Sequence, residues 1–376
     1  MAPRQAFLAM TLKSLLLSSD DKTVRVLRRV LSDLEIGVEH CSNSDDVVRR
    51  ITRRRFEAII VDCCDPQASG DVLRAAKAAP VNKRALSIVL VESQVGLKGG
   101  FDMGAHFVLH KPLTVERAKS SFRAVRALMK RERRLQLRVP VQIPLECIGT
   151  SRYQAKTLDV CEGGMAIEFK GRRSKESVLR FRFELPGSAD KFEVWGEMAW
   201  EGSADRAGVR FKDLTPDQHR ALRNWLSSQV PDPEPEDPPV ACRLNNLSMA
   251  GCYLSTASPF PKSTRVILSV RPAGPEIRAT GIVRITHAEF GMGVEFLQSS
   301  PAEKDQVREM IEALRLSESI EIFVEPDGLD TAALDNASAF VPSTDDPLVK
   351  LFHQKADLPA DAFLQQMQLC QLQESR

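Results

Sequence analysis

The sequence predicts a multidomain protein in which an α/β domain precedes two related β domains. In the first 130 residues, apolar runs of strand length alternate with helical patterns, which is typical of a parallel sheet covered by helices on both faces. From residue 139 onward, short strand-like segments separated by turns take over, and much of that pattern recurs 85 to 87 residues later. A repeat of this length indicates a duplicated domain and not a solenoid.

The expected α/β domain spans residues 10–130. Its apolar runs are 14–18, 58–62, 87–91 and 106–110, and its helical patterns include 22–34 and 71–79. A last helix is expected to start at Thr114, whose hydroxyl suits an N-cap. The apolar stripe that follows consists of Val115, Ala118, Phe122, Val125 and Met129.

The repeat is visible in four pairs of segments. The segment DVCEGGMAIE (159–168) returns as NLSMAGCYLS (246–255), WGEMAWE (195–201) as TGIVRIT (280–286), GVRF (208–211) as GVEF (293–296), and TPDQHRALRNWL (215–226) as SPAEKDQVREMI (300–311). A proline-rich acidic linker, PDPEPEDPP at 231–239, separates the copies. The β domains are therefore expected at 131–230 and 240–318.

Residues 319–376 are expected to form a tail that is partly helical or disordered. Two short apolar patterns within it, around Leu348–Phe352 and Phe363–Leu372, suit helices that dock on a folded domain.

Composition favours a folded protein of a reducing compartment. Hydrophobic residues make up 43% and charged residues 27% of the chain. The 8 cysteines show no CxxC or Cys/His ligand spacing, which fits the cytoplasm better than a disulfide framework. No apolar run reaches the ~18 residues of a membrane span. A net charge of +2 does not point to a nucleic-acid partner, and no recognised catalytic motif indicates an enzyme.

Charged residues at the start of the first β domain form the strongest candidate binding site. Arg134 and Arg138, which follow Arg133, carry planar guanidinium groups that suit phosphate oxygens and stack on bases. About twenty residues later, Asp159 suits the N–H donors of guanine, and Gly163–Gly164 allows a turn with close backbone approach to a ligand. On these features alone, the alternative is a solvated basic helix end followed by an ordinary hairpin turn.

The arginines, followed by the pattern Asp159-x-Cys161-x-x-Gly164, resemble the two motifs of the PilZ domain, a bacterial receptor for cyclic di-GMP. The resemblance covers about residues 131–229. It implies a six-stranded antiparallel barrel whose arginines hold an intercalated cyclic di-GMP dimer. The ligand contacts that it implies come from Arg133, Arg134, Arg138, Asp159, Cys161, Gly163 and Gly164. The family has serine where this chain has Cys161, a weaker donor, so we expect weakened but not abolished binding.

The second β domain also resembles a PilZ domain, in a degenerate form. Asn246, Ser248 and Gly251 match the second motif. The arginine pair is missing, because the chain upstream is the end of a helix followed by the acidic linker. We expect a scaffold or dimerisation module without a phosphate clamp.

The α/β domain resembles the flavodoxin-like receiver domain of response regulators. Asp62 lies at the phospho-acceptor position and Lys111 at the phosphate-contacting lysine. Ser19 and Asp20 align with the acidic pair of the family, so only Asp20 and Asp62 remain for a weakened magnesium site. Glu92 stands where the family has its switch hydroxyl. The resemblance thus implies a receiver whose phosphotransfer site is degenerate, a pseudo-receiver.

Together these features predict a cytoplasmic signalling adaptor with no resident cofactor. It would bind cyclic di-GMP at the first barrel and relay binding to a partner protein through rearrangement of its domains. The alternative is an interaction scaffold that binds no nucleotide. A third and less favoured hypothesis is a weak nucleic-acid binder that uses the basic segment 123–138. The sequence leaves homodimerisation and phosphorylation of Asp62 open.

Overall fold

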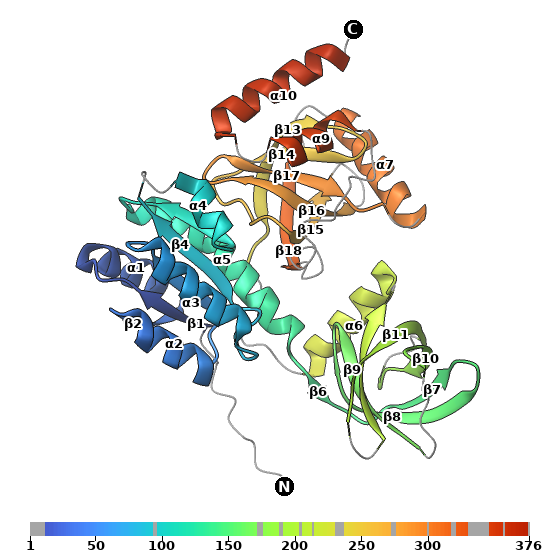
Figure 1. The fold of residues 1–376 in the computed structure, drawn as a ribbon. Coiled ribbons are helices and arrows are strands. Elements are labelled where there is room, and N and C mark those ends of the chain that lie inside the picture. Colours follow the sequence, from blue (N-terminus) through green and yellow to red (C-terminus); the bar gives the residue numbers. More distant parts are fainter. Residues whose placement is uncertain are drawn as a thin grey trace. The chain divides into compact units, whose positions relative to one another are not determined.

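The computed structural model describes most of the chain. The described residues are 12–92, 96–170, 176–187, 191–202, 205–212, 214–229, 237–271, 276–298, 301–316, 321–329, 346–355 and 358–374. The chain divides into two compact units, one formed by Met1–Glu132 with Glu236–Arg376 and the other by Arg133–Pro235 (Figure 1). Among the described residues, no helix combines the length and the apolar character needed to cross a membrane.

The first unit begins with a parallel sheet of five strands in the order β2-β1-β3-β4-β5. The strands are β1 (Leu12–Leu17), β2 (Ile36–Cys41), β3 (Ala58–Asp62), β4 (Leu86–Val91) and β5 (Phe107–His110). The helices are α1 (Asp21–Asp33), α2 (Ser44–Arg53), α3 (Pro66–Ala78), α4 (Gly96–Asp102) and α5 (Val115–Leu135).

Helices cover both faces of this sheet, and each face has its own apolar core. One core joins the sheet to α1 and α5, and the other joins it to α2 and α3 (Figure 1). Burial on both faces explains why the central strands read as continuous apolar runs. The strand order is that of flavodoxin-like folds, which confirms the expected receiver-like domain. Strand β2 escaped detection because its sequence, IGVEHC, is only partly apolar and partly exposed.

The second unit is a β-barrel closed by a helix. Its elements are β6 (Val139–Pro140), β7 (Pro144–Ile148), β8 (Arg152–Cys161), β9 (Gly164–Phe169), β10 (Val178–Glu184), β11 (Lys191–Glu201), β12 (Arg206–Lys212) and α6 (Pro216–Gln229). Six strands form an antiparallel ring, β8-β7-β10-β11-β12-β9, which closes through pairing of β9 with β8. Aromatic side chains such as Phe181 and Phe192 fill the interior, and Leu222 and Trp225 of α6 pack against it.

A second closed antiparallel barrel of six strands lies within the first unit. Its elements are β13 (Val240–Leu247), β14 (Gly251–Ser255), β15 (Thr264–Val270), β16 (Ile277–His287), β17 (Gly291–Phe296), α7 (Pro301–Leu316) and β18 (Ile322–Leu329). The order around the ring is β13-β14-β17-β16-β15-β18. Two C-terminal helices, α9 (Pro347–Gln354) and α10 (Ala360–Glu374), follow where the two apolar patterns of the tail predicted docking helices.

The two barrels share their register in detail, as expected for a duplication. The ladder between β8 and β9 shifts between Thr157 and Asp159, and the ladder between β13 and β14 shifts between Leu244 and Asn246. A bulge in β11 after Met198 returns in β16 after Val283. These irregularities lie at equivalent positions of the repeat, so the two copies share the details of their strand pairing as well as similar sequences.

One strand of the ring comes from a different part of the chain in each barrel. In the first barrel β7 precedes β8, whereas in the second barrel β18 takes the corresponding place after α7. The second barrel therefore extends to Leu329, beyond the boundary expected at residue 318. Pro326 and Gly328 interrupt the strand pattern of β18, which is why the sequence did not reveal it.

Within the first unit, charged side chains near the end of α5 join the receiver-like domain to the second barrel. Glu132 is 3% exposed; its carboxylate accepts hydrogen bonds from Arg84 Nε at 2.9 Å and from the Leu329 backbone N–H at 2.6 Å. Arg131 donates to Asp327 at 2.9 Å, and Lys130 to Asp237 at 3.1 Å. Charges are tolerated at such buried positions only when they are paired.

Replacing Glu132 by Ala should destabilise this unit. The substitution leaves the buried Leu329 N–H without its acceptor and the partly exposed Arg84 without its partner, at a cost of about 1–3 kcal/mol. Chemical denaturation should show the loss, and the Leu329 amide should exchange its hydrogen faster. Glu116→Ala, at an exposed position of the same helix, is the matched control. Equal stability of the two variants would contradict a role for Glu132 in joining the domains.

Candidate functional site

The arginine motif spans the end of α5. The helix ends at Leu135, so Arg133 and Arg134 lie in its last turn, and Arg138 lies beyond it in the segment that leads into β6. Backbone bonds from Gln136 to Arg133 and from Leu137 to Arg134 tighten this end. Cations in the last turn of a helix also interact favourably with its dipole. Helix α5 therefore positions Arg133 and Arg134, and the segment that leads into β6 positions Arg138.

The pairing of β6 with β8 brings Arg138 to Asp159. Val139 lies opposite Val160, and Pro140 lies opposite Asp159. Arg138 Nη1 consequently donates to Asp159 Oδ1 at 2.7 Å. Burial, the largest single influence, would lower the pKa of the Arg138 guanidinium, but the hydrogen bond to Asp159 together with the charges of Cys161 and Asp159 holds the pKa above its usual value. The Arg138 side chain remains 49% exposed, so a permanent cation is presented at the surface of the barrel.

The two glycines of the motif have different surroundings. Glu162 and Gly163 form the turn between β8 and β9. A Cβ atom on Gly164 would lie 2.1 Å from the carbonyl oxygen of Val209, so close packing of β9 on β12 requires glycine there. A Cβ atom on Gly163 would have no neighbour within 4 Å. Gly163 therefore leaves bare, accessible backbone, whereas Gly164 has a packing role.

Cys161 is buried, with 6% exposure, and lies close enough to Arg138 to influence the pKa of its guanidinium. The second barrel shows what a hydroxyl does at this position. Ser248 Oγ accepts hydrogen bonds from the backbone N–H groups of Ala250 and Gly251, at 3.3 and 3.1 Å. The serine thus holds the turn itself, a task for which a thiol is poorly suited. This geometry favours an indirect role for Cys161.

The structure adds two residues that sequence reasoning missed. Glu162 is 4% exposed and reaches α6, with His219 Nε2 at 3.5 Å and Arg223 Nε at 3.6 Å from its carboxylate, so it anchors the turn. Trp200 is 46% exposed and lies opposite Gly208. Neither has a sequence signal beyond its residue type, because a turn glutamate is usually solvated and a tryptophan is usually part of a core.

Trp200 lies in the same cross-strand row as Asp159. Trp200 pairs with Gly208, Gly208 with Ala166, and Ala166 with Asp159. The Trp200 indole leans over Gly208, where a Cβ atom would be only 2.0 Å from its Nε1. The row therefore joins an aromatic surface to a carboxylate on the outside of one barrel.

The second barrel has no counterpart of the arginine segment among its described residues. Strand β13 pairs with β14 and β18, and the described residues before it, 237–239, are Asp-Pro-Pro. The counterpart of Asp159 is Asn246, which is 8% exposed. In the part of the chain that the structure describes, this barrel is therefore entered without a counterpart of the segment that carries Arg138 in the first barrel.

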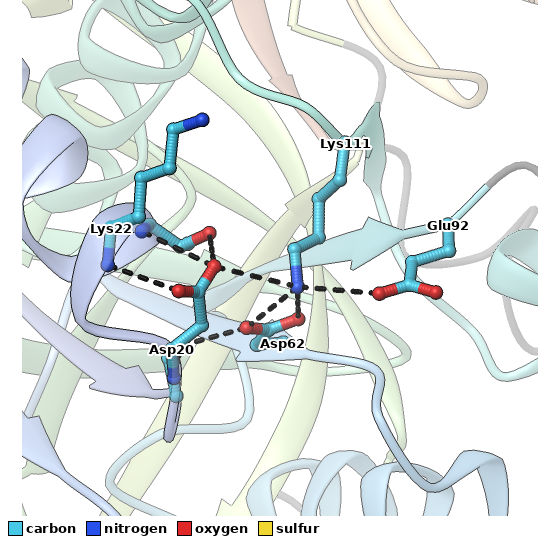
Figure 2. Close-up of polar contacts among 7 residues, drawn as sticks. Asp20, Lys22, Asp62, Glu92 and Lys111 are labelled. Atoms are coloured by element: carbon cyan, nitrogen blue, oxygen red, sulfur yellow. Dashed lines mark hydrogen bonds and ion pairs between the residues drawn. The ribbon is translucent and has the colours of Figure 1, made fainter.

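In the receiver-like domain, Asp62 is held by an internal ion pair. Lys111 Nζ lies 2.9 Å from Asp62 Oδ1 and 3.2 Å from Oδ2, and Ser18 Oγ donates to Oδ2 at 2.7 Å (Figure 2). Burial, the largest single influence, would lower the pKa of Lys111, but the hydrogen bond to Asp62 together with the surrounding negative charges raises the pKa above its usual value. Glu92 extends toward the same ammonium group, 3.9 Å away, in a mostly exposed position.

The remaining carboxylate, Asp20, is used as a helix cap. Its oxygens accept from the Lys22 and Thr23 backbone N–H groups and from Thr23 Oγ1, and the Thr23 hydroxyl contributes most to holding the pKa of Asp20 below its usual range. No group of three or more His, Cys, Asp or Glu side chains suited to a metal occurs among the described residues. With Asp20 and Asp62 both engaged, these residues do not fit a Mg²⁺ ion, which needs carboxylate oxygens free to coordinate it.

A cleft of about 510 Å³ opens beside this ion pair. Asp20, Glu92, Lys111 and Leu113 contribute to its walls. The cleft thus lies beside Lys111 and Asp20, whose charged groups have partners within the domain.

Comparison with protein families matches residues 132–228 and 229–313 to the PilZ domain. The second match ends before β18. A comparison with curated protein sequences finds no match.

Among solved structures, the receiver domain of a sensor histidine kinase from Pseudomonas aeruginosa PAO1 is 22% identical (TM-score 0.28; 32% of this chain and 98% of that chain). A chemotaxis response regulator of Vibrio cholerae is 19% identical (TM-score 0.28; 31% and 98%). A response regulator from Thermotoga maritima is 14% identical (TM-score 0.29; 31% and 99%). The receiver-like character of the α/β domain rests on its own strand order and on the placement of Asp62 and Lys111.

Acetyl phosphate with Mg²⁺ should label Asp62 poorly. Lys111 and Ser18 occupy the Asp62 oxygens, and Asp20 caps α1, so the metal that neutralises a transferring phosphoryl group lacks its ligands. Intact-mass analysis after incubation measures the label, with Asp62→Asn as the blank for phosphorylation elsewhere. Stoichiometric labelling that disappears in Asp62→Asn would show a working receiver instead.

Proposed function

We propose that this chain, in which two regions match the PilZ domain behind a receiver-like domain, is a signalling adaptor that binds cyclic di-GMP at its first barrel. The contact between Arg138 and Asp159 is the observation that carries the proposal. It brings a permanent cation and a partly exposed acceptor to one place at the surface of the barrel, and these are the two groups that an anionic guanine nucleotide needs.

Binding would proceed by exchange of partners. A phosphate of the ligand replaces Asp159 as the partner of Arg138, and the N–H groups on the guanine edge replace Arg138 as the partners of Asp159. The lost ion pair is half-exposed and contributes little to stability, so the exchange is inexpensive. Bare backbone at Gly163 admits the ligand, and the indole of Trp200 offers a surface on which a base can stack.

The position of the arginines suggests how binding is relayed. Arg133 and Arg134 lie in the last turn of α5, a helix that begins in the receiver-like domain. A ligand that engages them acts on the end of this helix. It can shift the arrangement of the domains only by its difference in affinity for two arrangements, ~1–3 kcal/mol in typical couplings.

The protein would pass on the signal by binding a partner protein and not by catalysing a reaction. We assign the receiver-like domain to partner recognition, because its phosphotransfer residues are engaged with one another. We place the protein in the cytoplasm, where the seven described cysteines remain free thiols.

Arg138→Ala should weaken the binding of cyclic di-GMP by about tenfold or more. The substitution removes a charge-assisted hydrogen bond, which contributes ~1.5–3 kcal/mol. Isothermal titration calorimetry on the full chain measures the change. Arg152→Ala is the matched control, because Arg152 is a 74% exposed arginine at the opposite end of β8. If both substitutions leave the affinity unchanged, the ligand does not bind at this end of the barrel.

Cys161→Ser should tighten binding by a few-fold. The new hydroxyl can accept the turn N–H groups as Ser248 does, which pre-organises the backbone at Gly163. The same titration measures the affinity, and hydrogen exchange at the Gly164 amide reports on the turn. If the turn becomes better protected but the affinity for cyclic di-GMP stays the same, the turn does not affect binding, and Cys161 has no role in it.

A further inference from the structure

Helices α9 and α10 cover an outer face of the second barrel. Val349 and Phe352 of α9 and Phe363 of α10 pack on Tyr253 and Ile285, and all five side chains are at most 2% exposed. Figure 1 shows both helices outside the barrel, on the side of β14 and β17. The tail therefore buries aromatic side chains against strands that would otherwise face solvent.

The barrel does not need this tail to fill its interior. The two residues next to Tyr253 in the strand, Cys252 and Leu254, point inward and belong to the barrel's own core. Val307 and Met310 of α7 complete this core. The residues under the tail form a separate apolar cluster on the opposite face of the same strands. Helix α9 is thus added to a finished barrel.

The covered face is shaped for an aromatic ring. A Cβ atom on Gly293 would lie 2.7 Å from Phe352 Cε1, so the ring fits only because this position is glycine. At Gly251, a Cβ atom would come within 3.3 Å of Val349 Cγ2. The ring of Phe363 completes the cover, with its centroid 5.5 Å from that of Tyr253.

The same row of the first barrel is built differently. Ile285, Gly293, Tyr253 and Asn246 of the second barrel pair across the strands as Trp200, Gly208, Ala166 and Asp159 do in the first. In the first barrel, the indole of Trp200 itself covers the glycine and remains 46% exposed. In the second barrel the smaller Ile285 shares the space over Gly293 with Phe352: a Cβ atom there would lie 2.6 Å from Ile285 Cγ2 and 2.7 Å from Phe352 Cε1, and Phe352 comes from elsewhere in the chain.

Polar contacts stabilise both ends of helix α9. Asp346 caps α9 by accepting from the N–H groups of Leu348 and Val349. His353 Nε2 lies 3.7 Å from Glu295 Oε2, and Glu295 also pairs with Arg284 at 2.5 Å. Because both Glu295 and Arg284 are at most 9% exposed, a helix without a matching polar group there would bury a charged pair with poorer compensation.

We propose that the second barrel is a receptor for a short amphipathic helix and that α9, with α10 behind it, is its built-in ligand. The ligand class is a capped helix with an aliphatic residue three positions before a phenylalanine and a histidine directly after it. Sixteen residues of sequence, 330–345, separate β18 from Asp346, so the helix is attached as a tethered ligand is. The proposal does not depend on nucleotide binding by the first barrel.

A peptide supplied in trans tests the proposal on the full chain. Phe352→Asp should release the tail from its slot. A fluorescein-labelled peptide of residues 346–368 should then bind this variant saturably in an anisotropy titration. The wild-type chain should bind the peptide at least tenfold more weakly, because its own tethered helix competes at high effective concentration. Gln354→Asp, which places the same charge at an exposed position of α9, should behave as the wild type does.

Two readouts complete the test. A peptide that carries the Phe352→Asp substitution should not bind, and hydrogen exchange should show β14 and β17 of the Phe352→Asp chain still protected. The proposal is overturned if the intact variant fails to bind the peptide. It is equally overturned if the variant loses protection across the barrel, because α9 would then be an integral part of the fold.

Discussion

The pairing of β6 with β8 is the constraint on which the candidate binding site depends. Because Pro140 lies opposite Asp159, the chain must pass from the end of α5 to the barrel with Arg138 beside that carboxylate. A helix end and a two-residue strand thereby fix two chemical groups that lie about twenty residues apart in the sequence. Arrangement by backbone pairing is more dependable than arrangement by mobile side chains alone.

The two barrels differ in the origin of one strand and in the segment that leads into each. In the first barrel the chain reaches the ring through the arginine segment and β6, and β7 follows. In the second barrel β18 comes from downstream, and the chain enters through an acidic linker instead. In the second barrel α9 covers the equivalent outer row with Phe352. A duplicated fold can carry different surfaces at equivalent positions, because fold and site are separable.

Local sequence was sufficient for much of the fold and for naming the residues of the candidate site. Apolar runs located four of the five parallel strands, and the repeat located both barrels, because these features are periodic or duplicated. The use of β18 in place of β7 depends on pairing between distant segments, which local periodicity does not encode. Likewise, Asp20 as a cap, Ser18 as the neighbour of Asp62 and Trp200 on the surface are set by three-dimensional packing.

Calorimetric titration of the full wild-type chain with cyclic di-GMP is the most direct test of nucleotide recognition by the first barrel. The arrangement of Arg138, Asp159 and the exposed turn predicts saturable binding that weakens as salt rises, because phosphate contacts by arginine are screened. The absence of any binding heat at high micromolar ligand and low salt would contradict it and would leave the chain as a scaffold that binds no nucleotide.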